Sequence, residues 1–142
     1  MPQHLNSLAY YGRYLRQVLY TLFIEHKLSL PLWDMHIGYG SDILTTLHYY
    51  VIGDPLTLLA VFVPESKTET LYAFLIFLRI YLAGIAFSRY SFYHKNSKQA
   101  TFMGTMIYIF AGWTIYAAMK HPYFSNPMIY LPLILLGIDK IY

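Results

Sequence analysis

The chain has 142 residues, of which 57% are hydrophobic and 12% are charged, whereas soluble domains average about 45–50% apolar and about 25% charged residues. It carries a net charge of +3 and no cysteine, so disulfides, thiolate metal sites and cysteine nucleophiles are excluded. Apart from one short connection its basic residues are scattered, so we expect no nucleic-acid partner.

The first predicted element is an amphipathic helix over about residues 8–25, and Asn6 or Ser7 is expected to cap its start. A basic, aromatic-rich helix of this kind lies in the membrane interface or packs on a neighbouring protein surface, and both remain open. Its apolar positions recur at three- and four-residue spacing: Leu8, Tyr11, Leu15, Val18 and Leu22.

Prolines and glycines break residues 30–64 into short pieces. Asp42 is expected to open a helix that Gly53 closes, and Asp54-Pro55 to start another as N-cap and first-turn proline. We predict a partly inserted helical hairpin that does not span, because broken backbone at membrane depth needs cover from protein or a wet cavity.

Two apolar stretches at 71–89 and 101–119 predict a membrane hairpin, since each approaches the ~20 residues that an α-helix needs to cross about 30 Å of hydrocarbon. A third stretch, 126–142, begins with Asn126-Pro127, again a cap followed by a first-turn proline. The predicted fold class is all-α: a polytopic membrane protein fragment with juxtamembrane helices over 1–70 and about three transmembrane helices.

The connection at residues 89–100 sets the expected orientation. It contains Arg89, Lys95 and Lys98 and no acidic residue, so the positive-inside rule places it in the cytoplasm. Residues 1–70 are then extracytoplasmic.

Carboxylates and imidazoles concentrate between residues 31 and 55. Such groups beside a membrane surface can bind a divalent cation or act in acid–base chemistry. The spacing matches no tight metal signature, so the metal stays unknown and a divalent cation is the one candidate cofactor. Asp42 also has a simpler interpretation as a helix cap. The catalytic candidates are Asp34, His36 and Asp42.

Arg79 lies in the middle of an apolar helix, where a charge costs at least about 2.5–3.5 kcal/mol, so it should face protein, a partner or a wet cavity. It either holds a phosphate or carboxylate or pairs with an acid on another helix. Lys120 and His121 either meet an anionic headgroup or anchor the interface. The candidate substrate-binding residues are His48, Tyr49, Asp54, Arg79, Lys120 and His121.

Three segments carry a resemblance to a known family: W-D-x-x-I-G-x-G-S-D at 33–42, Y-Y-x-x-G-D-P at 49–55 and LRIYLAGIAFSRY at 78–90. From about residue 3 to residue 142 the chain resembles the bacterial YfhO family of multi-spanning membrane proteins. That family is similar to GT-C glycosyltransferases, which take a sugar from a polyprenyl-phosphate carrier at the outer face of the membrane.

The resemblance implies a multi-pass protein of the bacterial cytoplasmic membrane that glycosylates an envelope polymer such as lipoteichoic acid. Residues 1–70 would correspond to the first extracytoplasmic loop. The expected partners are membrane lipid, a polyprenyl-phosphate-linked sugar and the remaining transmembrane helices of a longer protein. The chain is expected to be an internal piece of that protein, inactive alone, so whether it is itself an enzyme stays open.

Two other functions fit the sequence. One is a transporter or flippase in which Arg79 and the broken helices line a path for lipid headgroups. The other is a non-catalytic scaffold for an envelope complex.

Overall fold

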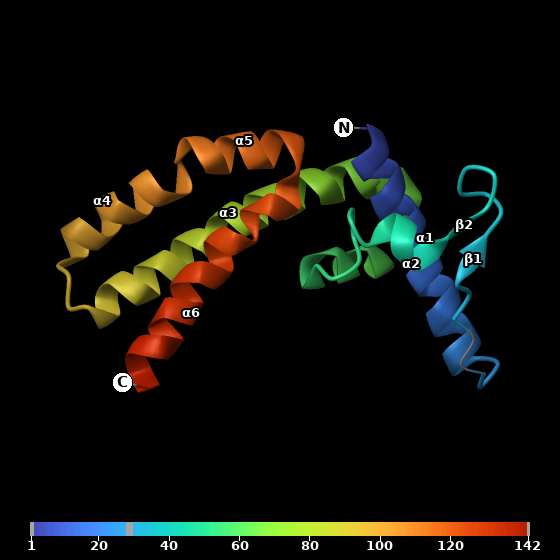
Figure 1. The fold of residues 1–142 in the computed structure, drawn as a ribbon, viewed down its shortest axis with the longest axis horizontal. Coiled ribbons are helices and arrows are strands. Elements are labelled where there is room, and N and C mark those ends of the chain that lie inside the picture. Colours follow the sequence, from blue (N-terminus) through green and yellow to red (C-terminus); the bar gives the residue numbers. More distant parts are fainter. Residues whose placement is uncertain (1, 28–29, 142) are drawn as a thin grey trace. The chain divides into compact units, whose positions relative to one another are not determined.

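A computed structural model describes residues 2–27 and 30–141 of the chain. The chain forms two compact units, Met1–Leu75 and Ile76–Tyr142. Their boundary falls inside the longest helix, α3 (Thr68–Tyr93) (Figure 1). Nearly all regular structure is helical, as predicted, and the exception is a pair of two-residue strands, β1 (Trp33–Asp34) and β2 (Ser41–Asp42).

Helix α1 (Pro2–Phe23) begins earlier than predicted. Proline suits the first position of a helix, because its missing N–H has no intrahelical acceptor there. Asn6 and Ser7 therefore lie inside the helix, and the Ser7 hydroxyl donates to the Gln3 carbonyl at 2.8 Å. The prediction that either residue caps the helix was wrong.

Helix α2 (Ile43–Leu47) is capped by Asp42, whose side chain accepts from the Thr45 N–H at 2.7 Å, as predicted. The helix ends well before Gly53. The His48 ring nitrogen lies 2.7 Å from the Thr45 carbonyl oxygen, the acceptor that a continuing helix would offer to the amide of residue 49. The chain then turns and passes Gly53 in a left-handed conformation, with φ of 93°.

The next element, η1 (Pro55–Phe62), is a 3-10 helix capped by Asp54, whose side chain accepts from the Leu56 N–H at 3.0 Å. One guanidinium nitrogen of Arg16 donates to the carbonyls of Ala60 at 3.1 Å and Val63 at 2.8 Å. A Cβ at Gly12 would lie only 2.7 Å from the Ala60 oxygen. Helix α1 and η1 therefore touch backbone to backbone, and the interface requires glycine at position 12.

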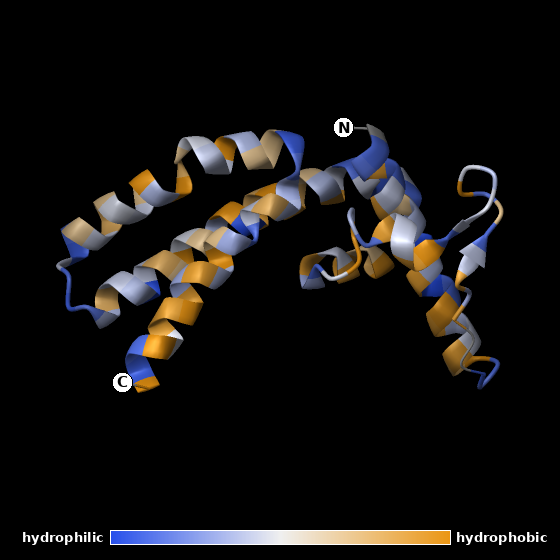
Figure 2. Ribbon diagram, viewed as in Figure 1, coloured by the Kyte–Doolittle hydropathy of each residue, from blue (hydrophilic) through white to orange (hydrophobic). Residues whose placement is uncertain are grey.

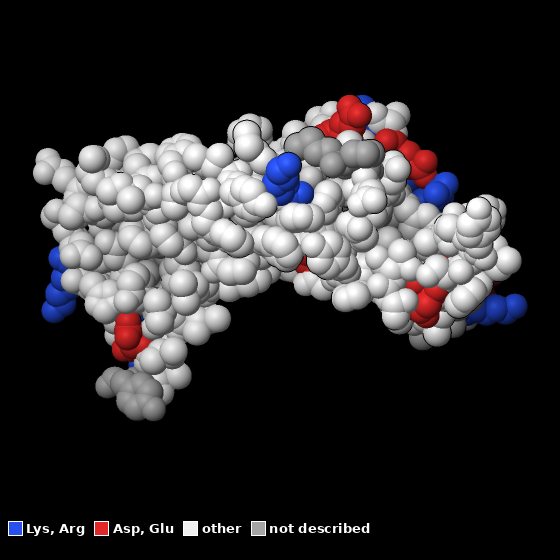
Figure 3. Space-filling view, turned by 45° about the horizontal axis from the view of Figure 1, so that its top comes forward, with Lys and Arg blue, Asp and Glu red and all other residues white. Residues whose placement is uncertain are grey.

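Among the described residues one helix is long and apolar enough to cross a membrane, Glu65–Tyr93. It joins η2 (Glu65–Lys67) to α3. Figure 2 shows apolar residues along most of α3, and the second unit, Ile76–Tyr142, presents a broad uncharged surface in Figure 3. The first predicted span thus has the length and composition that a crossing needs.

The second predicted span is divided into α4 (Lys98–Ile109) and α5 (Gly112–Lys120), whose axes differ by 42°. It counts as a crossing only if both parts traverse the bilayer together. After the 3-10 turn η3 (Pro122–Ser125), α6 (Pro127–Ile141) has 15 residues, fewer than the ~20 that a span needs. One or two spans are therefore supported, and the predicted third is not confirmed.

Within the second unit the helices are held by hydroxyl pairs and small residues. Ser88 and Thr105 lie 2.9 Å apart, oxygen to oxygen, and Ser91 and Thr101 make the same contact between α3 and α4. Hydroxyl groups and small side chains let helices approach closely where lipid removes the hydrophobic driving force. Helices α3 and α6 share a small buried core, to which α3 contributes Ala83 and Ala86 and α6 contributes Met128 and Ile129.

Helix α6 also covers the break between α4 and α5. The Tyr108 hydroxyl donates to the Met128 carbonyl at 3.0 Å, and the buried Thr114 hydroxyl lies 2.7 Å from the Met128 sulfur. The Tyr108 carbonyl, which the break removes from the regular helix ladder, accepts from the Ala111 N–H at 3.3 Å. Helix α6 thus holds one side of the irregular backbone, whereas Phe110 and Gly112 at the break stay exposed.

Candidate functional site

A polar pocket of about 310 Å³ lies in the first unit, between α1 and the turn that joins β1 to β2. Helical spacing of three, four and seven residues brings four α1 side chains to one face. The turn supplies a carboxylate and an imidazole. The lining residues are Tyr10, Arg13, Tyr14, Gln17, Asp34 and His36.

The turn is shaped by a short ladder and two glycines. Trp33 pairs with Asp42, and Asp34 with Ser41. Gly38 and Gly40 have φ of 63° and 101°, a left-handed conformation that glycine adopts without steric cost. This local geometry holds Asp34 against α1.

Asp34 is the centre of the hydrogen bonding in the pocket. One carboxylate oxygen accepts from the Tyr10 hydroxyl, and the other lies 2.8 Å from both the His36 backbone nitrogen and the His36 ring Nδ1. These hydrogen bonds, the one from Tyr10 most of all, lower the pKa of Asp34 to about 2. Burial and the neighbouring carboxylate raise the pKa of Tyr10, so Asp34 is an anion and Tyr10 a neutral donor at neutral pH.

His36 is oriented by this carboxylate while its ring stays open to solvent. The side chain is 93% exposed, and Nδ1 is the ring atom directed at Asp34. Nε2 is therefore the atom through which the imidazole would reach a ligand. A carboxylate on Nδ1 selects the tautomer with Nδ1–H and a basic Nε2.

Arg13 adds a cation to the same pocket. Its Nε lies 3.6 Å from a carboxylate oxygen of Glu65, and its guanidinium stands over the Tyr10 ring at 5.5 Å. Both partners leave part of the guanidinium exposed. A pocket with an oriented imidazole, an anion and a guanidinium can bind hydroxyl and phosphate groups and transfer a proton.

The structure places the other candidates of the first unit outside this lining. Asp42 and Asp54 act as helix caps, and hydrogen bonds from Thr45, the backbone one most of all, lower the pKa of Asp42. The His48 ring binds the Thr45 carbonyl, and the Tyr49 ring packs edge-on against Tyr50.

Three candidates lie in the second unit. Arg79 is only 3% exposed, and its Nε donates to the Asn126 side-chain oxygen at 3.1 Å. Asn126 directly precedes α6, which starts at Pro127 as predicted, but its dihedrals are helical, φ −59° and ψ −38°, and its side-chain oxygen accepts from Arg79. Lys120 is exposed at the end of α5 and His121 is half-buried. Their contact with a substrate stays a prediction.

Sequence reasoning missed all four α1 residues of the pocket, although their helical spacing marks a polar face of α1: Tyr10, Arg13, Tyr14 and Gln17. It also missed Asn126 as the partner of Arg79. In the part of the chain that the structure describes, no group of three or more metal-ligating side chains converges.

The apolar α3 with its buried arginine, and a polar pocket in the other unit, fit a helical membrane protein. The chain belongs to the YfhO family: residues 14–142 match the family model described as "Bacterial membrane protein YfhO". The suspected resemblance is thus confirmed, and with it a bacterial membrane protein. No curated protein and no solved structure matches the chain.

Proposed function

We propose that this chain forms part of a membrane-embedded, GT-C-like glycosyltransferase that uses a polyprenyl-phosphate sugar to modify a cell-envelope polymer. The observation that supports it best is the Asp34–His36 pair, which shares a pocket with the Arg13 guanidinium. The reaction breaks the bond between the sugar C1 and the phosphate oxygen. It forms a bond from C1 to the acceptor oxygen, and it releases polyprenyl phosphate and the acceptor hydroxyl proton.

His36 is the proposed general base. Its Nε2 takes the acceptor proton, while Asp34 holds the Nδ1–H and stabilises the imidazolium that forms, as the carboxylate of a catalytic triad does. Asp34 is itself a weak base, because its pKa of about 2 lies far below the near-neutral value that suits proton abstraction. The catalytic role expected for Asp34 is therefore proposed as a positioning role.

The leaving phosphate is assigned to Arg13, because a guanidinium matches phosphate oxygens in a planar fork and stabilises the negative charge that develops on departure. The carrier chain needs an apolar surface. The first unit has an apolar pocket of about 390 Å³ beside Lys67, lined by Leu59, Phe62, Leu71 and Phe74 among others. This assignment takes the phosphate contact away from Arg79, whose Nε is hydrogen-bonded to Asn126.

The test uses the intact protein, encoded at its own locus, and follows sugar incorporation into the envelope polymer. Replacing His36→Gln should lower incorporation about 100-fold or more, the usual contribution of a general base. Asp34→Asn should lower it by a smaller factor and shift its pH profile. The matched control is His26→Gln, an exposed histidine just beyond α1, which should leave incorporation unchanged at equal protein abundance.

The alternatives give different results in the same cells. If His36→Gln leaves the sugar on its carrier at the inner face, the chain serves translocation. If incorporation and translocation both continue, the pocket is not catalytic and the scaffold function is favoured.

A further inference from the structure

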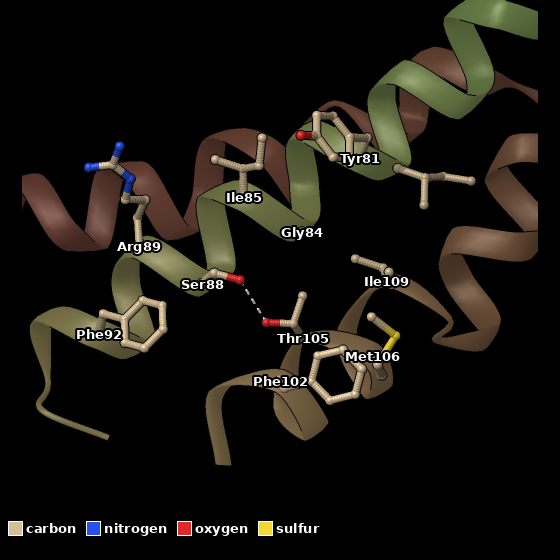
Figure 4. A pocket seen from close by; sticks show the side chains of 11 residues that line it. Tyr81, Gly84, Ile85, Ser88, Arg89, Phe92, Phe102, Thr105, Met106 and Ile109 are labelled. Carbon is tan, nitrogen blue, oxygen red and sulfur yellow. Dashed lines mark hydrogen bonds between the residues drawn. The ribbon is translucent and has the colours of Figure 1, made fainter. Parts of the chain in front are cut away.

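A groove of about 360 Å³ runs between α3 and α4 in the second unit. In Figure 4, Tyr81, Ile85 and Arg89 follow one another along α3, while Phe102, Met106 and Ile109 come from α4. The hydroxyls of Ser88 and Thr105 point at each other between the helices and satisfy one another at 2.9 Å. Apart from that pair, Arg89 and the Tyr81 hydroxyl, the lining is apolar.

Arg89 gives this groove one charged end. It is exposed, and no carboxylate in the described part of the chain lies within 4.0 Å of its guanidinium. It sits one turn before the end of α3, at the start of the connection that also carries Lys95 and Lys98. Basic side chains at such a level attract anionic headgroups.

The groove has the length of one lipid leaflet. From Tyr81 to Phe92 the α3 backbone rises about 17 Å at 1.5 Å per residue, and half of the bilayer hydrocarbon is about 15 Å thick. An apolar channel of that length that ends at a guanidinium matches the two parts of a phospholipid. A neighbouring transmembrane helix would also fill the apolar channel, but it would engage Arg89 only if it carried an acid at the same level.

We infer that the groove between α3 and α4 binds one acyl chain of an anionic phospholipid whose phosphate is held by Arg89. Gly84 lines the groove at the place where α3 approaches α4. A Cβ there would lie 3.5 Å from side-chain methyl carbons of both Thr105 and Ile109. Any branched side chain at this position would therefore occupy the path of the acyl chain. The inference concerns the second unit and is independent of the glycosyltransferase proposal.

The headgroup is tested with the intact protein in nanodiscs of phosphatidylcholine and a minor share of phosphatidylglycerol. Native mass spectrometry counts the lipids that stay bound. Wild type should retain phosphatidylglycerol several-fold above its share, and Arg89→Gln should lose that enrichment. The matched control Lys95→Gln removes an equal charge from the same connection, outside the groove lining, and should keep it. Equal losses in both variants would mean diffuse attraction and would overturn the proposal.

The groove is tested separately. Gly84→Val should release bound phosphatidylglycerol and phosphatidylcholine alike. Gly137→Val on α6 should retain them, because a Cβ at that position would meet nothing within 4 Å. Should Gly84→Val fail to fold, Ile85→Trp in a background that lacks both native tryptophans, Trp33→Phe and Trp113→Phe, provides a second measurement. Brominated acyl chains of phosphatidylglycerol should quench its fluorescence more strongly than those of phosphatidylcholine. Retention of lipid in Gly84→Val, or equal quenching by both lipids, would mean that a helix or bulk lipid covers this face.

Discussion

Three hydrogen-bond donors surround the Asp34 carboxylate, and they stabilise its charged form only when the chain is folded. Its pKa of about 2 lies below the ~3.9 of an unfolded aspartate, so the folded state binds the proton more weakly. The resulting stabilisation is complete above about pH 4 and is lost as the pH falls from there towards 2.

This difference predicts local opening of the turn at residues 33–42 in acid. In a Trp113→Phe background, Trp33 is the sole tryptophan and reports the turn by its fluorescence. We expect a transition between about pH 4 and pH 2 that disappears in Asp34→Asn. Glu25→Gln, at an exposed carboxylate, should retain it. A transition of equal size in Asp34→Asn would show that another group is responsible.

At this scale the sequence predicts contacts that are close along the chain. Asp34 and His36 are two residues apart, and the caps at Asp42 and Asp54 follow from their position before Thr45 and Leu56. Tyr10 lies 24 residues from Asp34, and only the folding of the turn onto α1 brings them together. The composition of α1 alone does not indicate which of its tyrosines meets the carboxylate.

Between elements, the contact of Arg79 with Asn126 ties α3 to the start of α6. Asn126→Leu removes one acceptor of a buried guanidinium and should lower the free energy of unfolding by about 1.5–3 kcal/mol. Arg79→Met combined with Asn126→Leu should recover part of that loss, because a buried charge is then no longer left short of an acceptor.

Unfolding of the purified protein in mixed micelles measures both effects. Asn6→Leu, on an exposed position of α1, is the control and should change the free energy by less than about 0.5 kcal/mol. If Asn126→Leu is as mild as this control, the side-chain contact does not hold the two helices.

The predicted helices differ from the observed ones where tertiary contacts decide. No proline marks the break at Phe110 and Ala111, so hydropathy predicts one continuous span there. The structure instead places Ala111 in an extended conformation, with ψ of 148°, and Met128 of α6 contacts Tyr108 and Thr114 on either side of the break. Similarly, the short apolar run after Asp54 was expected to be an α-helix. It forms the 3-10 helix η1 instead, and Arg16 donates to carbonyls at the end of this run.

For the whole molecule, charge predicts the direction in which the chain crosses the membrane. Because the chain has no cysteine, a single Ser41→Cys or Ser97→Cys replacement can be labelled without background. An impermeant maleimide should modify position 41 on intact cells and position 97 only after permeabilisation. Labelling of 97 but not 41 on intact cells would reverse the orientation and place the Asp34 pocket in the cytoplasm.

Composition was enough to predict a helical membrane protein, because lipid tolerates few charges and requires internally satisfied backbone. The number of crossings was harder to predict, since α6 and the α4–α5 pair fall near the limit of length where packing decides. The polar pocket was partly predictable, because its acid and imidazole are adjacent in sequence while its cation and hydroxyls come from another element.

The joint between α4 and α5 has a mechanical consequence. Arms of 12 and 9 residues measure about 18 and 13.5 Å, and at 42° the pair is about 2 Å shorter from end to end than a straight rod of the same residues. If both parts cross the bilayer together, opening or closing the joint would let the pair match bilayers whose thickness differs by a few ångströms. An unbroken helix such as α3 can adapt to the same change in bilayer thickness only by tilting.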